Sequence, residues 1–599
     1  MAEAQKVRWG ILGPGGIAKD FFAGVKDSKT GTLVAIGTRN PAKPGLAEDF
    51  AGARILNGYE ALIADPEVDA IYIAIPHPGH AEWAIKAAQG GKHVLCEKPM
   101  SLTAPEADAM IHAASIAGTF LGEAYMYRLH PIVAKLIELL KSGIIGDVRM
   151  IKSSFGFAMP SVMPEHRLYS SALAGGGILD VGGYPLSMVR LVAGVNSPSG
   201  FLDPDKISGV GHIGETGVDE WASAVLHFPN GIVAEVSCSV SVNQENVLRI
   251  HGTKGRIELN DFWFAGVGKT GGTGTIRVFD KSGAKTDVTV SEAKHLYSFE
   301  ADAVAAAIGT GKQEFSIPGM SWADSLGNLK AMDKWRADIG LVLEPEIPAN
   351  RTLTIGGNAL KVQKIQVPRG HIKGLAKETS LVALGSEGLG SYSAAEIMFD
   401  AFYEAGGSMF DTAFMYFGGV PETRFGHWMK TRGVRKDVAI IAKGVHSPLC
   451  YPDVIGKQLA ASLERMQTDH VDIYFMHRDN PDIPVGEFVD ALDIEVKAGR
   501  IRGPFGGSNW TRARMNDAIA YATRTGKAKP MALSNNFSLA EMVNPVWDGC
   551  IACSDDEWKE WLRATGVTNF AWSSQARGFF TDRAGPNRFD DMELARAPR

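Results

Sequence analysis

Cysteine is scarce in this chain, with five residues of that type among 599. An odd and scattered set does not make a disulfide framework and is typical of a reducing compartment, so we expect a cytoplasmic protein. Cys550 and Cys553 form a single C-x-x-C pair, without the second pair that would complete a zinc site. We therefore expect no metal.

An excess of positive charge and long apolar runs are also lacking. The chain has 61 Lys and Arg against 67 Asp and Glu, a formal net charge of −6 and a pI near 6.2, so it has no basic surface for nucleic acid. No apolar run approaches the length of a membrane span, and the first residues, MAEAQK, lack the apolar stretch of a signal peptide. We expect neither nucleic acid nor a membrane among the partners.

The composition that is present is that of an ordinary globular protein. Hydrophobic residues make up 45% of the chain and charged residues 21%. Because one hydrophobic core does not serve 599 residues, we expect roughly three or four folding units.

The chain begins with a pattern that predicts a dinucleotide site. Val7–Leu12 is a largely apolar run, which predicts a buried parallel strand, and a glycine turn and a helical pattern follow it. In Gly13-x-Gly15-x-x-Ala18 the glycines permit a tight turn and a close approach of the backbone to a diphosphate at the helix N-terminus. The predicted phosphate-binding residues are Gly13, Gly15, Gly16 and Ile17.

The end of the second predicted strand favours NADP over NAD. Leu33–Ile36 is the next apolar run, and Thr38 and Arg39 follow where an NAD site would carry an acidic residue. A hydroxyl and a guanidinium suit a 2′-phosphate, although Arg39 in isolation is also compatible with a solvated surface residue.

Two further predicted strands end in residues that would face the cofactor. Ala70–Ile75 ends at Pro76, with His77 and His80 beyond it, and His93–Cys96 ends in Glu97, Lys98 and Pro99. Strand carboxyl ends line the ligand crevice of an open α/β sheet. The predicted cofactor contacts are Pro76, His80, Glu97 and Lys98. Lys98 is also a candidate hydrogen-bond donor or proton shuttle.

Three sequence motifs of this half resemble those of the Gfo/Idh/MocA oxidoreductases. They are WGILGPGGIA, Glu97-Lys98-Pro99 and the segment EAYMYRLHP, and a fourth match, GGGILDVGGYP, lies further along. The resemblance spans about residues 5–345. It implies a Rossmann domain over residues 1–124 and, over residues 125–345, an α/β substrate domain with a large open antiparallel sheet that is often used to form homo-oligomers. Alternating strands with turn signals agree with this sheet: Glu220–Phe228, Ile232–Val242, Val247–His251 and Arg256–Glu258.

The resemblance also implies a catalytic site. Lys98 and Tyr184 would flank the substrate carbon that loses hydride, with Asp180 in the same site. Many relatives carry His at the position of Tyr184, and the Tyr form resembles the dihydrodiol, xylose and glucose–fructose oxidoreductase branch. We expect Lys98 to lower the pKa of the Tyr184 phenol so that it accepts the alcohol proton. The alternative is that Asp180 and Tyr184 only cap and pack a helix start.

A further set of polar residues is expected at the junction of these two domains, where a sugar's hydroxyl groups need partners: Glu123, Tyr127, Arg128 and His130.

The second half predicts a barrel of repeated strand–helix units. Residues 346–372 are marked by Pro, Asn and Gly and predict a linker, and residues 373–599 carry the repeated pattern. Seven strands are predicted: Leu381–Leu384, Met409–Phe410, Val438–Ala442, Val471–Met476, Gly503–Gly507, Pro530–Leu533 and Asn569–Trp572.

Ionisable residues lie at the predicted carboxyl ends of these strands, where barrel enzymes carry their catalytic groups. They are Asp411, Tyr416, Lys443 and His477, and they resemble the catalytic tetrad of the aldo-keto reductases, one residue each. Tyr416 would donate a proton to a carbonyl if Lys443 lowers its pKa, while His477 orients the substrate oxygen. Positions that match the family's nicotinamide contacts are Ser508, Asn509, Asn536 and Trp572. The alternative is that these strand-end residues are ordinary core and helix-capping residues.

The barrel pattern lacks an eighth strand. Only Ser573–Arg599 follows the seventh, and it is rich in Arg, Asp and Pro. Three explanations stay open: the segment is lost, the half is partly non-functional, or another subunit covers the open edges. The fold class is therefore α/β, a Rossmann domain plus an open-sheet domain followed by a (β/α)₈-type barrel without its last unit.

Together these patterns predict a bifunctional NADP-dependent oxidoreductase for sugars or polyols. The first half would oxidise a hydroxyl and the second would reduce a carbonyl, which makes the pair redox-neutral. One alternative is that only the first half is catalytic and the barrel is a structural or decaying appendage. Another is a sensor that binds NADP(H) without turnover, which the complete sets of proton-transfer groups argue against.

Overall fold

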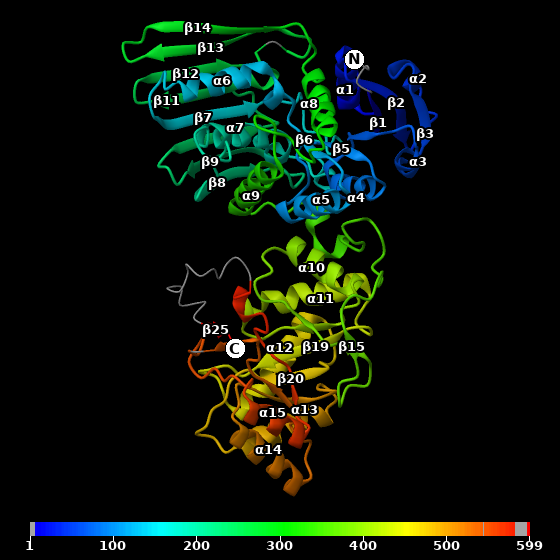
Figure 1. Ribbon diagram of the computed structural model, residues 1–599, viewed down its shortest axis with the longest axis vertical. Helices are drawn as coiled ribbons and strands as arrows, with labels where there is room; N and C mark the ends of the chain where they lie inside the picture. Colours follow the sequence, from blue (N-terminus) through cyan, green and yellow to red (C-terminus); the bar gives the residue numbers. More distant parts are fainter. Residues whose placement is uncertain (1–5, 267, 543, 581–595, 599) are drawn as a thin grey trace. The chain divides into compact units, whose positions relative to one another are not determined.

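Two compact units make up the protein, Met1–Asn358 and Ala359–Arg599, and each has its own hydrophobic core (Figure 1). A chain of this length exceeds what one core can serve, so the division is expected. The computed structural model describes residues 6–266, 268–542, 544–580 and 596–598.

A six-stranded parallel sheet, ordered β3-β2-β1-β4-β5-β6, opens the first unit. The strand order reverses between β1 and β4, which is the switch point where doubly wound sheets bind ligands. The predicted Rossmann domain is therefore confirmed. Its strands are β1 (Val7–Leu12), β2 (Gly31–Thr38), β3 (Arg54–Asn57), β4 (Ala70–Ile73), β5 (His93–Glu97) and β6 (Leu121–Ala124). Its helices are α1 (Gly16–Asp27), α2 (Leu46–Asp49), α3 (Tyr59–Ala64), α4 (His80–Gln89) and α5 (Ala104–Ala117).

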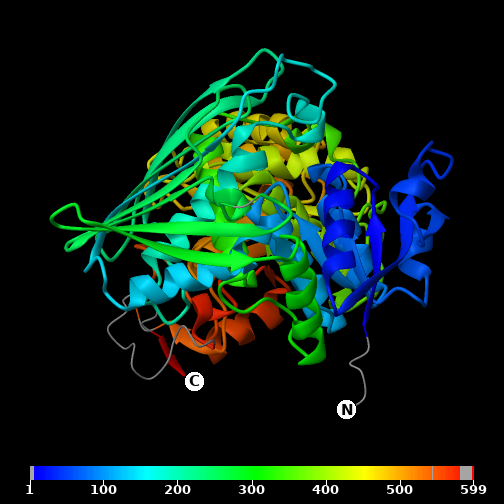
Figure 2. The same cartoon turned by 90° about the horizontal axis from the view of Figure 1, so that it is seen from above.

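An eight-stranded sheet follows, ordered β14-β13-β12-β11-β7-β10-β9-β8, and forms one curved layer (Figure 2). All its pairs are antiparallel except β7 with β10. Its strands are β7 (Val148–Gly156), β8 (Lys206–Ile213), β9 (Asp219–His227), β10 (Val233–Ser239), β11 (Val247–Gly252), β12 (Gly255–Asn260), β13 (Gly272–Asp280) and β14 (Lys285–Glu292). The accompanying helices are α6 (Pro131–Lys141), α7 (Gly183–Ala193), α8 (Ser298–Gly309) and α9 (Trp322–Asp338). The open-sheet prediction is confirmed.

One face of this larger sheet is covered and the other is open. Along β9, buried and exposed residues alternate, as the two-residue period of a half-buried strand requires. The helices α6, α7 and α9 contact the sheet. On the open face Val210, Trp221 and Val225 are exposed, Val210 to 70%.

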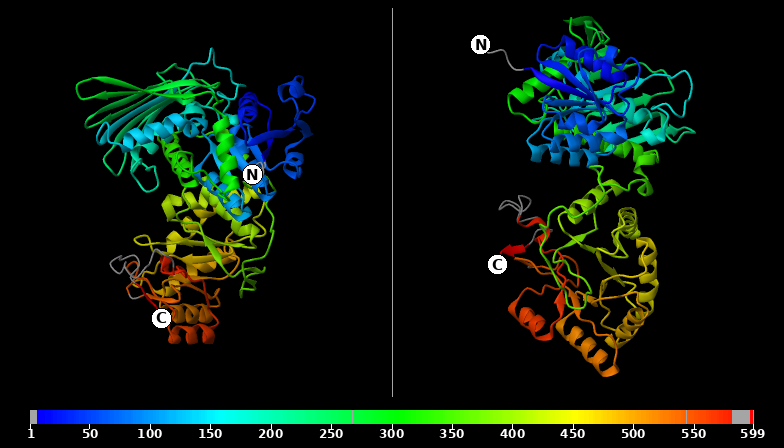
Figure 3. Two further views of the ribbon diagram at one scale, coloured as in Figure 1. Left: turned by 45° about the horizontal axis from the view of Figure 1, so that its top comes forward. Right: turned by 90° about the vertical axis from the view of Figure 1, so that its right-hand side faces the viewer.

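The second unit contains a seven-stranded parallel sheet, ordered β17-β18-β19-β20-β21-β22-β24, with helices on its outer side (Figure 3). The seven predicted strands are confirmed with small shifts of their ends: β17 (Ala383–Gly385), β18 (Met409–Asp411), β19 (Ala439–Gly444), β20 (Ile473–Met476), β21 (Phe505–Ser508), β22 (Ala532–Ser534) and β24 (Thr568–Asn569). The helices are α10 (Tyr392–Glu404), α11 (Val420–Arg432), α12 (Pro452–Met466), α13 (Val485–Lys497), α14 (Arg512–Thr525) and α15 (Asp556–Thr565). The last strand is shorter than predicted, because Trp572 makes only an isolated bridge to Asn536.

The seven strands form an open barrel within the described part of the chain. There β17 pairs only with β18, and β24 only with β22. After β24 the described residues contain β25 (Arg596–Pro598), which pairs with β23 (Ala540–Met542) and not with the barrel. The predicted absence of an eighth strand also falls on residues 581–595, which lie outside the described residues.

Candidate functional sites

A cavity of about 550 Å³ lies where β1, β4 and β5 end in the first unit. A volume of this size suits a small-molecule site. The structure brings nine predicted site residues to its wall: Gly15, Gly16, Ile17, Pro76, His80, Glu97, Lys98, Asp180 and Tyr184. Gly13, Thr38 and Arg39 do not line it.

The glycine turn forms one end of the cavity and fits a diphosphate. Gly13 has a φ of +93°, and a Cβ there would meet Ile75 Cγ2 at 2.5 Å, so only glycine is tolerated. Gly15 caps α1 without a side-chain hydrogen bond, and the first turn has no acidic residue. A Cβ on Gly16 would meet nothing within 4 Å. The free N–H groups of the first turn therefore face open space, which is what a nicotinamide dinucleotide's phosphates need.

The end of β2 carries no acidic side chain. Thr38 is buried, and its Oγ1 accepts a hydrogen bond of 3.1 Å from the Asn40 N–H. Arg39 is exposed, and its guanidinium carbon lies 5.8 Å from the centroid of the Tyr59 ring. Its part in binding a 2′-phosphate stays a prediction.

Lys98 connects the two halves of the site. It follows β5 directly, and its Nζ donates to the backbone oxygen of Asp180 at 2.6 Å. The same Nζ lies 3.5 Å from Asp180 Oδ1 and 5.0 Å from the centroid of the Tyr184 ring. The three residues implied by the family resemblance therefore meet in one place.

The predicted activation of Tyr184 is wrong. Burial, followed by the nearby Glu97 and Asp180, raises the pKa of the Tyr184 phenol well above its usual value. Lys98 faces the ring of Tyr184, while the Tyr184 hydroxyl contacts Met126 Sδ at 3.7 Å. The Lys98 charge thus stabilises the phenolate too little to offset burial.

Asp180 sits between two cations, one of which the sequence did not reveal. It lies in the short helix Ile178–Gly182, and its Oδ1 accepts from Arg167 Nη1 at 2.7 Å. Burial alone would raise the pKa of Asp180, but Lys98 and Arg167 outweigh it and lower that pKa. Arg167 belongs to the segment between β7 and this helix, where nothing in the local pattern marks one arginine among other exposed residues.

His80 and Glu97 line the cavity but are held by the fold. The ring nitrogens of His80 contact the backbone oxygens of Pro99 and Ile75, each at 2.8 Å. Glu97 accepts from the Tyr72 hydroxyl and, at 3.2 Å, from the Lys98 N–H, and burial raises its pKa. Both residues brace the strand ends that present Lys98.

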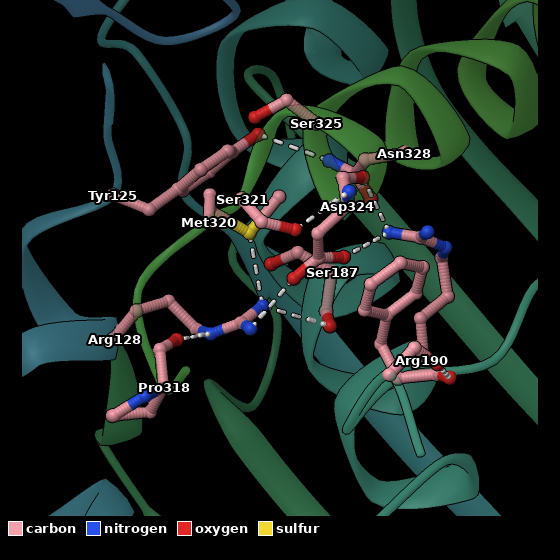
Figure 4. Close-up of polar contacts among 12 residues, drawn as sticks. Tyr125, Arg128, Ser187, Arg190, Pro318, Met320, Ser321, Asp324, Ser325 and Asn328 are labelled. Atoms are coloured by element: carbon pink, nitrogen blue, oxygen red, sulfur yellow. Dashed lines mark hydrogen bonds and ion pairs between the residues drawn. The ribbon is translucent and has the colours of Figure 1, made fainter. Parts of the chain in front are cut away.

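The residues expected to meet substrate hydroxyl groups at the domain junction do not line the cavity. Arg128 is buried and donates to Asp324 Oδ2 at 2.8 Å and to the Pro318 backbone oxygen at 2.7 Å (Figure 4). Glu123 accepts from the Met100 N–H at 2.9 Å and from Ser325 Oγ at 2.6 Å. The remaining two, Tyr127 and His130, are buried as well. All four are structural, and that prediction is wrong.

A second cluster of catalytic type lies in the second unit. Lys443, in β19, donates to both carboxylate oxygens of Asp411, the last residue of β18. Its Nζ is 5.4 Å from the centroid of the Tyr416 ring, and the Tyr416 and His477 rings are 5.6 Å apart. A cavity of about 130 Å³ is lined by Lys443 and His477, together with His446.

The protonation of this cluster differs from expectation at Tyr416. Burial raises the pKa of Tyr416 despite the opposing effect of Lys443, so the predicted lowering is wrong. Burial and the positive charge of Lys443 lower the pKa of His477 well below its usual value, so the imidazole is neutral. A neutral phenol and a neutral imidazole are both donors for a carbonyl oxygen.

Three of the four predicted nicotinamide contacts of the second unit have side-chain hydrogen bonds within the chain: Ser508, Asn509 and Asn536. Ser508 Oγ donates to the Ser534 backbone oxygen at 2.9 Å, and Asn509 Oδ1 accepts from the Ile551 N–H at 3.1 Å. Asn536 Nδ2 donates to the Trp572 backbone oxygen at 3.1 Å. Buried atoms without a partner are Asn536 Oδ1 and Trp572 Nε1. Their cofactor role stays a prediction.

Within the described ranges, no group of three or more His, Cys, Asp or Glu side chains is arranged to hold a metal ion. The helices among those residues include none that is both long and apolar enough to cross a membrane.

Comparison with known proteins agrees with this architecture. The model of the oxidoreductase family with an NAD-binding Rossmann fold (GFO/IDH/MocA) matches residues 7–125, and that of the GFO/IDH/MocA C-terminal domain matches residues 133–258. The model of the aldo/keto reductase family matches residues 382–596.

Individual relatives match the first unit. A trans-1,2-dihydrobenzene-1,2-diol dehydrogenase of Mus musculus is 37% identical over 263 residues, which are 43% of this chain and 75% of the relative. D-xylose 1-dehydrogenase (NADP(+)) 2 of Haloferax volcanii is 35% identical over 254 residues, 42% of this chain and 75% of the relative. The solved structure of KijD10, a 3-ketoreductase from Actinomadura kijaniata in complex with NADP and TDP-benzene, shares the fold with a TM-score of 0.50, at 24% identity over 56% of this chain and 98% of that one. The chain is thus an oxidoreductase of the Gfo/Idh/MocA family, fused to an aldo/keto reductase domain.

Proposed function

We propose that the first unit is an NADP-dependent dehydrogenase that oxidises a secondary hydroxyl of a sugar, a polyol or a related cyclic diol. One observation carries this proposal: a single cavity has a phosphate-binding turn at one end and Lys98, Asp180 and Tyr184 on its wall. The relatives named as dehydrogenases of a dihydrodiol and of xylose support the same class of reaction.

The residues of the site divide the work as follows. A nicotinamide cofactor, when bound, accepts the hydride from the carbinol carbon. Lys98, fixed by its bonds to Asp180, donates a hydrogen bond to the substrate oxygen and stabilises negative charge on it. Tyr184 exchanges the proton with that oxygen: its ionised form accepts the proton during oxidation, and its neutral form donates it during reduction.

The pH dependence follows from the raised pKa of Tyr184. At neutral pH the phenol is protonated, so the phenolate that accepts the proton is rare. As long as the pH is below the pKa of Tyr184, the phenolate fraction increases about tenfold for each unit by which the pH rises. We expect kcat/KM for alcohol oxidation to rise steeply between about pH 7 and pH 9, and kcat/KM for the reverse reduction to stay flat there. Initial rates in both directions measure this. A rising oxidation rate that persists in Tyr184→Phe would contradict the assignment.

The preference for NADP rests on Arg39. The end of β2 has an exposed guanidinium and no carboxylate, an arrangement that suits a 2′-phosphate. Arg39→Ala should weaken NADP⁺ binding by about 1.5–3 kcal/mol, roughly 10- to 150-fold, because a charge-assisted contact is lost. Titration calorimetry with NAD⁺, which lacks this phosphate, is the internal control. Equal losses for both cofactors would refute the preference.

We infer that the second unit reduces a carbonyl with the same cofactor, so that the full chain runs a redox-neutral pair of reactions. Support comes from the Asp411–Lys443 pair and from the neutral Tyr416 and His477 beside it. The alternative, that only the first unit turns over, is favoured by the engaged nicotinamide contacts and by the two unpaired barrel edges of the described residues.

We also infer a homo-oligomer formed through the open sheet face of residues 125–345. Apolar side chains on that face, among them Val210, Trp221 and Val225, are exposed, and such patches mark interaction surfaces. Sedimentation of wild type and of a Val210→Glu variant tests this interface.

The activity is tested on the full chain with a panel of aldoses, polyols and cyclic diols. NADPH formation is followed with NADP⁺, and NADPH consumption with aldehydes. Formation with at least one alcohol supports the proposed dehydrogenase. Its absence across the panel, with cofactor shown to bind, overturns it.

A further inference from the structure

Arg167 is a charged residue of the cavity wall that the proposed mechanism does not use. It lies in the exposed segment between β7 and the short helix that carries Asp180, and its side chain is 54% exposed. A half-exposed guanidinium on a cavity wall is accessible to a ligand and still ordered by its neighbours.

Most of its hydrogen-bonding capacity is free. A guanidinium has five N–H donors. In the described part of the chain Arg167 makes one hydrogen bond, from Nη1 to Asp180 Oδ1 at 2.7 Å. The remaining donors have no protein acceptor there, and the planar fork of an arginine matches an oxyanion with two oxygens.

Arg167 shares its acidic partner with a second cation. Asp180 Oδ1 faces two cations, Arg167 at 2.7 Å and Lys98 at 3.5 Å. Lys269, elsewhere on the wall, is neutralised by Asp20 at 2.6 Å. Burial lowers the pKa of His77 to about 3, so this histidine adds no positive charge.

Glu97, the remaining acid of the wall, is bonded to other groups of the chain. Its oxygens accept from the Tyr72 hydroxyl and the Lys98 N–H, and burial raises its pKa. Asp180, and not Glu97, is thus the acid bonded to Arg167, and an anionic ligand would occupy the free donors of that guanidinium.

Part of the cavity wall is apolar. Phe155, Phe157, Leu173 and Phe264 line the cavity, and the Phe155 ring centroid lies 5.1 Å from that of Tyr184. A ligand that satisfies both features has one anionic group and a compact carbon skeleton that can lie against aromatic rings.

We propose that Arg167 is a specificity-determining residue that binds a carboxylate on the substrate, so that the first unit prefers hydroxy acids built on a compact ring or chain. A carboxylate has two coplanar oxygens that match the free donors of the guanidinium, whereas a phosphate monoester is close to two negative charges at neutral pH. The substrate assignment rests on the proposed dehydrogenase, but the anion site itself is accessible to a binding measurement.

Binding of three probes to the full chain, saturated with NADP⁺, tests the site by titration calorimetry: benzoate, its neutral analogue benzamide, and phenyl phosphate. We expect benzoate to bind at least about tenfold more tightly than benzamide. Arg167→Gln should weaken benzoate about 10- to 100-fold and leave benzamide within about twofold, and Arg167→Lys should fall between, because it keeps the charge without the fork. Arg149→Gln, on the exposed part of β7, is the matched control.

Equal affinity for benzoate and benzamide, or equal losses for both in Arg167→Gln, overturns the proposal, because a residue that only supports Asp180 would affect both probes alike. Tighter binding of phenyl phosphate than of benzoate overturns the choice of carboxylate. Steady-state kinetics compare cyclic hydroxy acids with their amides as substrates. Arg167→Gln should raise KM for the acid and not for the amide. If no alcohol is oxidised while benzoate still binds through Arg167, the dehydrogenase assignment fails and the anion site stands.

Discussion

Replacement of Lys98 by methionine should lower kcat for alcohol oxidation by about 10²–10⁴ and leave the dissociation constant of NADP⁺ nearly unchanged. Lys98 bonds to Asp180 and lies over the Tyr184 ring, whereas the phosphate-binding turn is formed by a different strand and helix. The loss should therefore appear in the chemical step and not in cofactor binding. Steady-state rates of NADPH formation and calorimetric titration of NADP⁺ measure the two effects.

Two controls make this result specific. Lys135→Met removes a lysine from α6 outside the cavity and should change neither quantity. Tyr416→Phe in the second unit should abolish aldehyde-dependent NADPH consumption while alcohol oxidation continues. Near-normal alcohol oxidation in Lys98→Met would remove this lysine from the mechanism, and aldehyde reduction that survives Tyr416→Phe would favour the single-activity alternative.

Periodicity was sufficient to predict the architecture. The apolar run Val7–Leu12 is β1 residue for residue, and the seven predicted strands of the second unit all form. Parallel strands buried on both faces must be apolar almost throughout, so short runs such as those of β19 and β20 stand out from the amphipathic helices between them. Strand ends shifted by a few residues because ends depend on pairing partners, which a single strand's sequence does not specify.

Side-chain roles were predicted less well, because they depend on depth and on distant partners. The motif placed Tyr184 beside Lys98, but only coordinates show that the ammonium faces the ring and not the hydroxyl, so that burial decides the pKa of Tyr184. Arg167 lies 13 residues before Asp180, in a segment with no periodicity, and its ion pair exists only in three dimensions. Local sequence cannot reveal such a contact.

The same limit explains why Arg128 was assigned to substrate. Polar residues after a strand of an α/β sheet are candidates for ligand contact. Arg128 instead turns inward, where Asp324 accepts from it and, through its other oxygen, from Arg190 at 2.6 Å (Figure 4). Asp324 comes from α9, about two hundred residues further along the chain.

This buried triad leads to the largest expected change in stability. All three residues of the triad, Asp324, Arg128 and Arg190, are buried. Asp324→Ala therefore leaves the Arg128 charge without a counter-ion in the core. Arg190 keeps its ion pair with Asp203. Removing one partner of a buried ion pair costs about 3–5 kcal/mol. Since domains are stable by about 5–15 kcal/mol, the first unit should lose roughly a fifth or more of its stability.

Thermal unfolding of the full chain measures this loss. A shift caused by NADP⁺ that Arg39→Ala reduces identifies the transition of the first unit, because Arg39 lies in that unit. Asp287→Ala breaks the exposed pair with Lys285, which is worth about 0–1 kcal/mol, and is the matched control on the same unit. Asp324→Asn keeps the shape of the side chain and removes its charge. It therefore separates the effect of lost packing from the effect of the lost counter-ion. If Asp324→Ala shifts the transition of the first unit no more than Asp287→Ala does, Arg128 and Arg190 do not depend on the Asp324 carboxylate. In that case the structural role assigned to Arg128 is wrong.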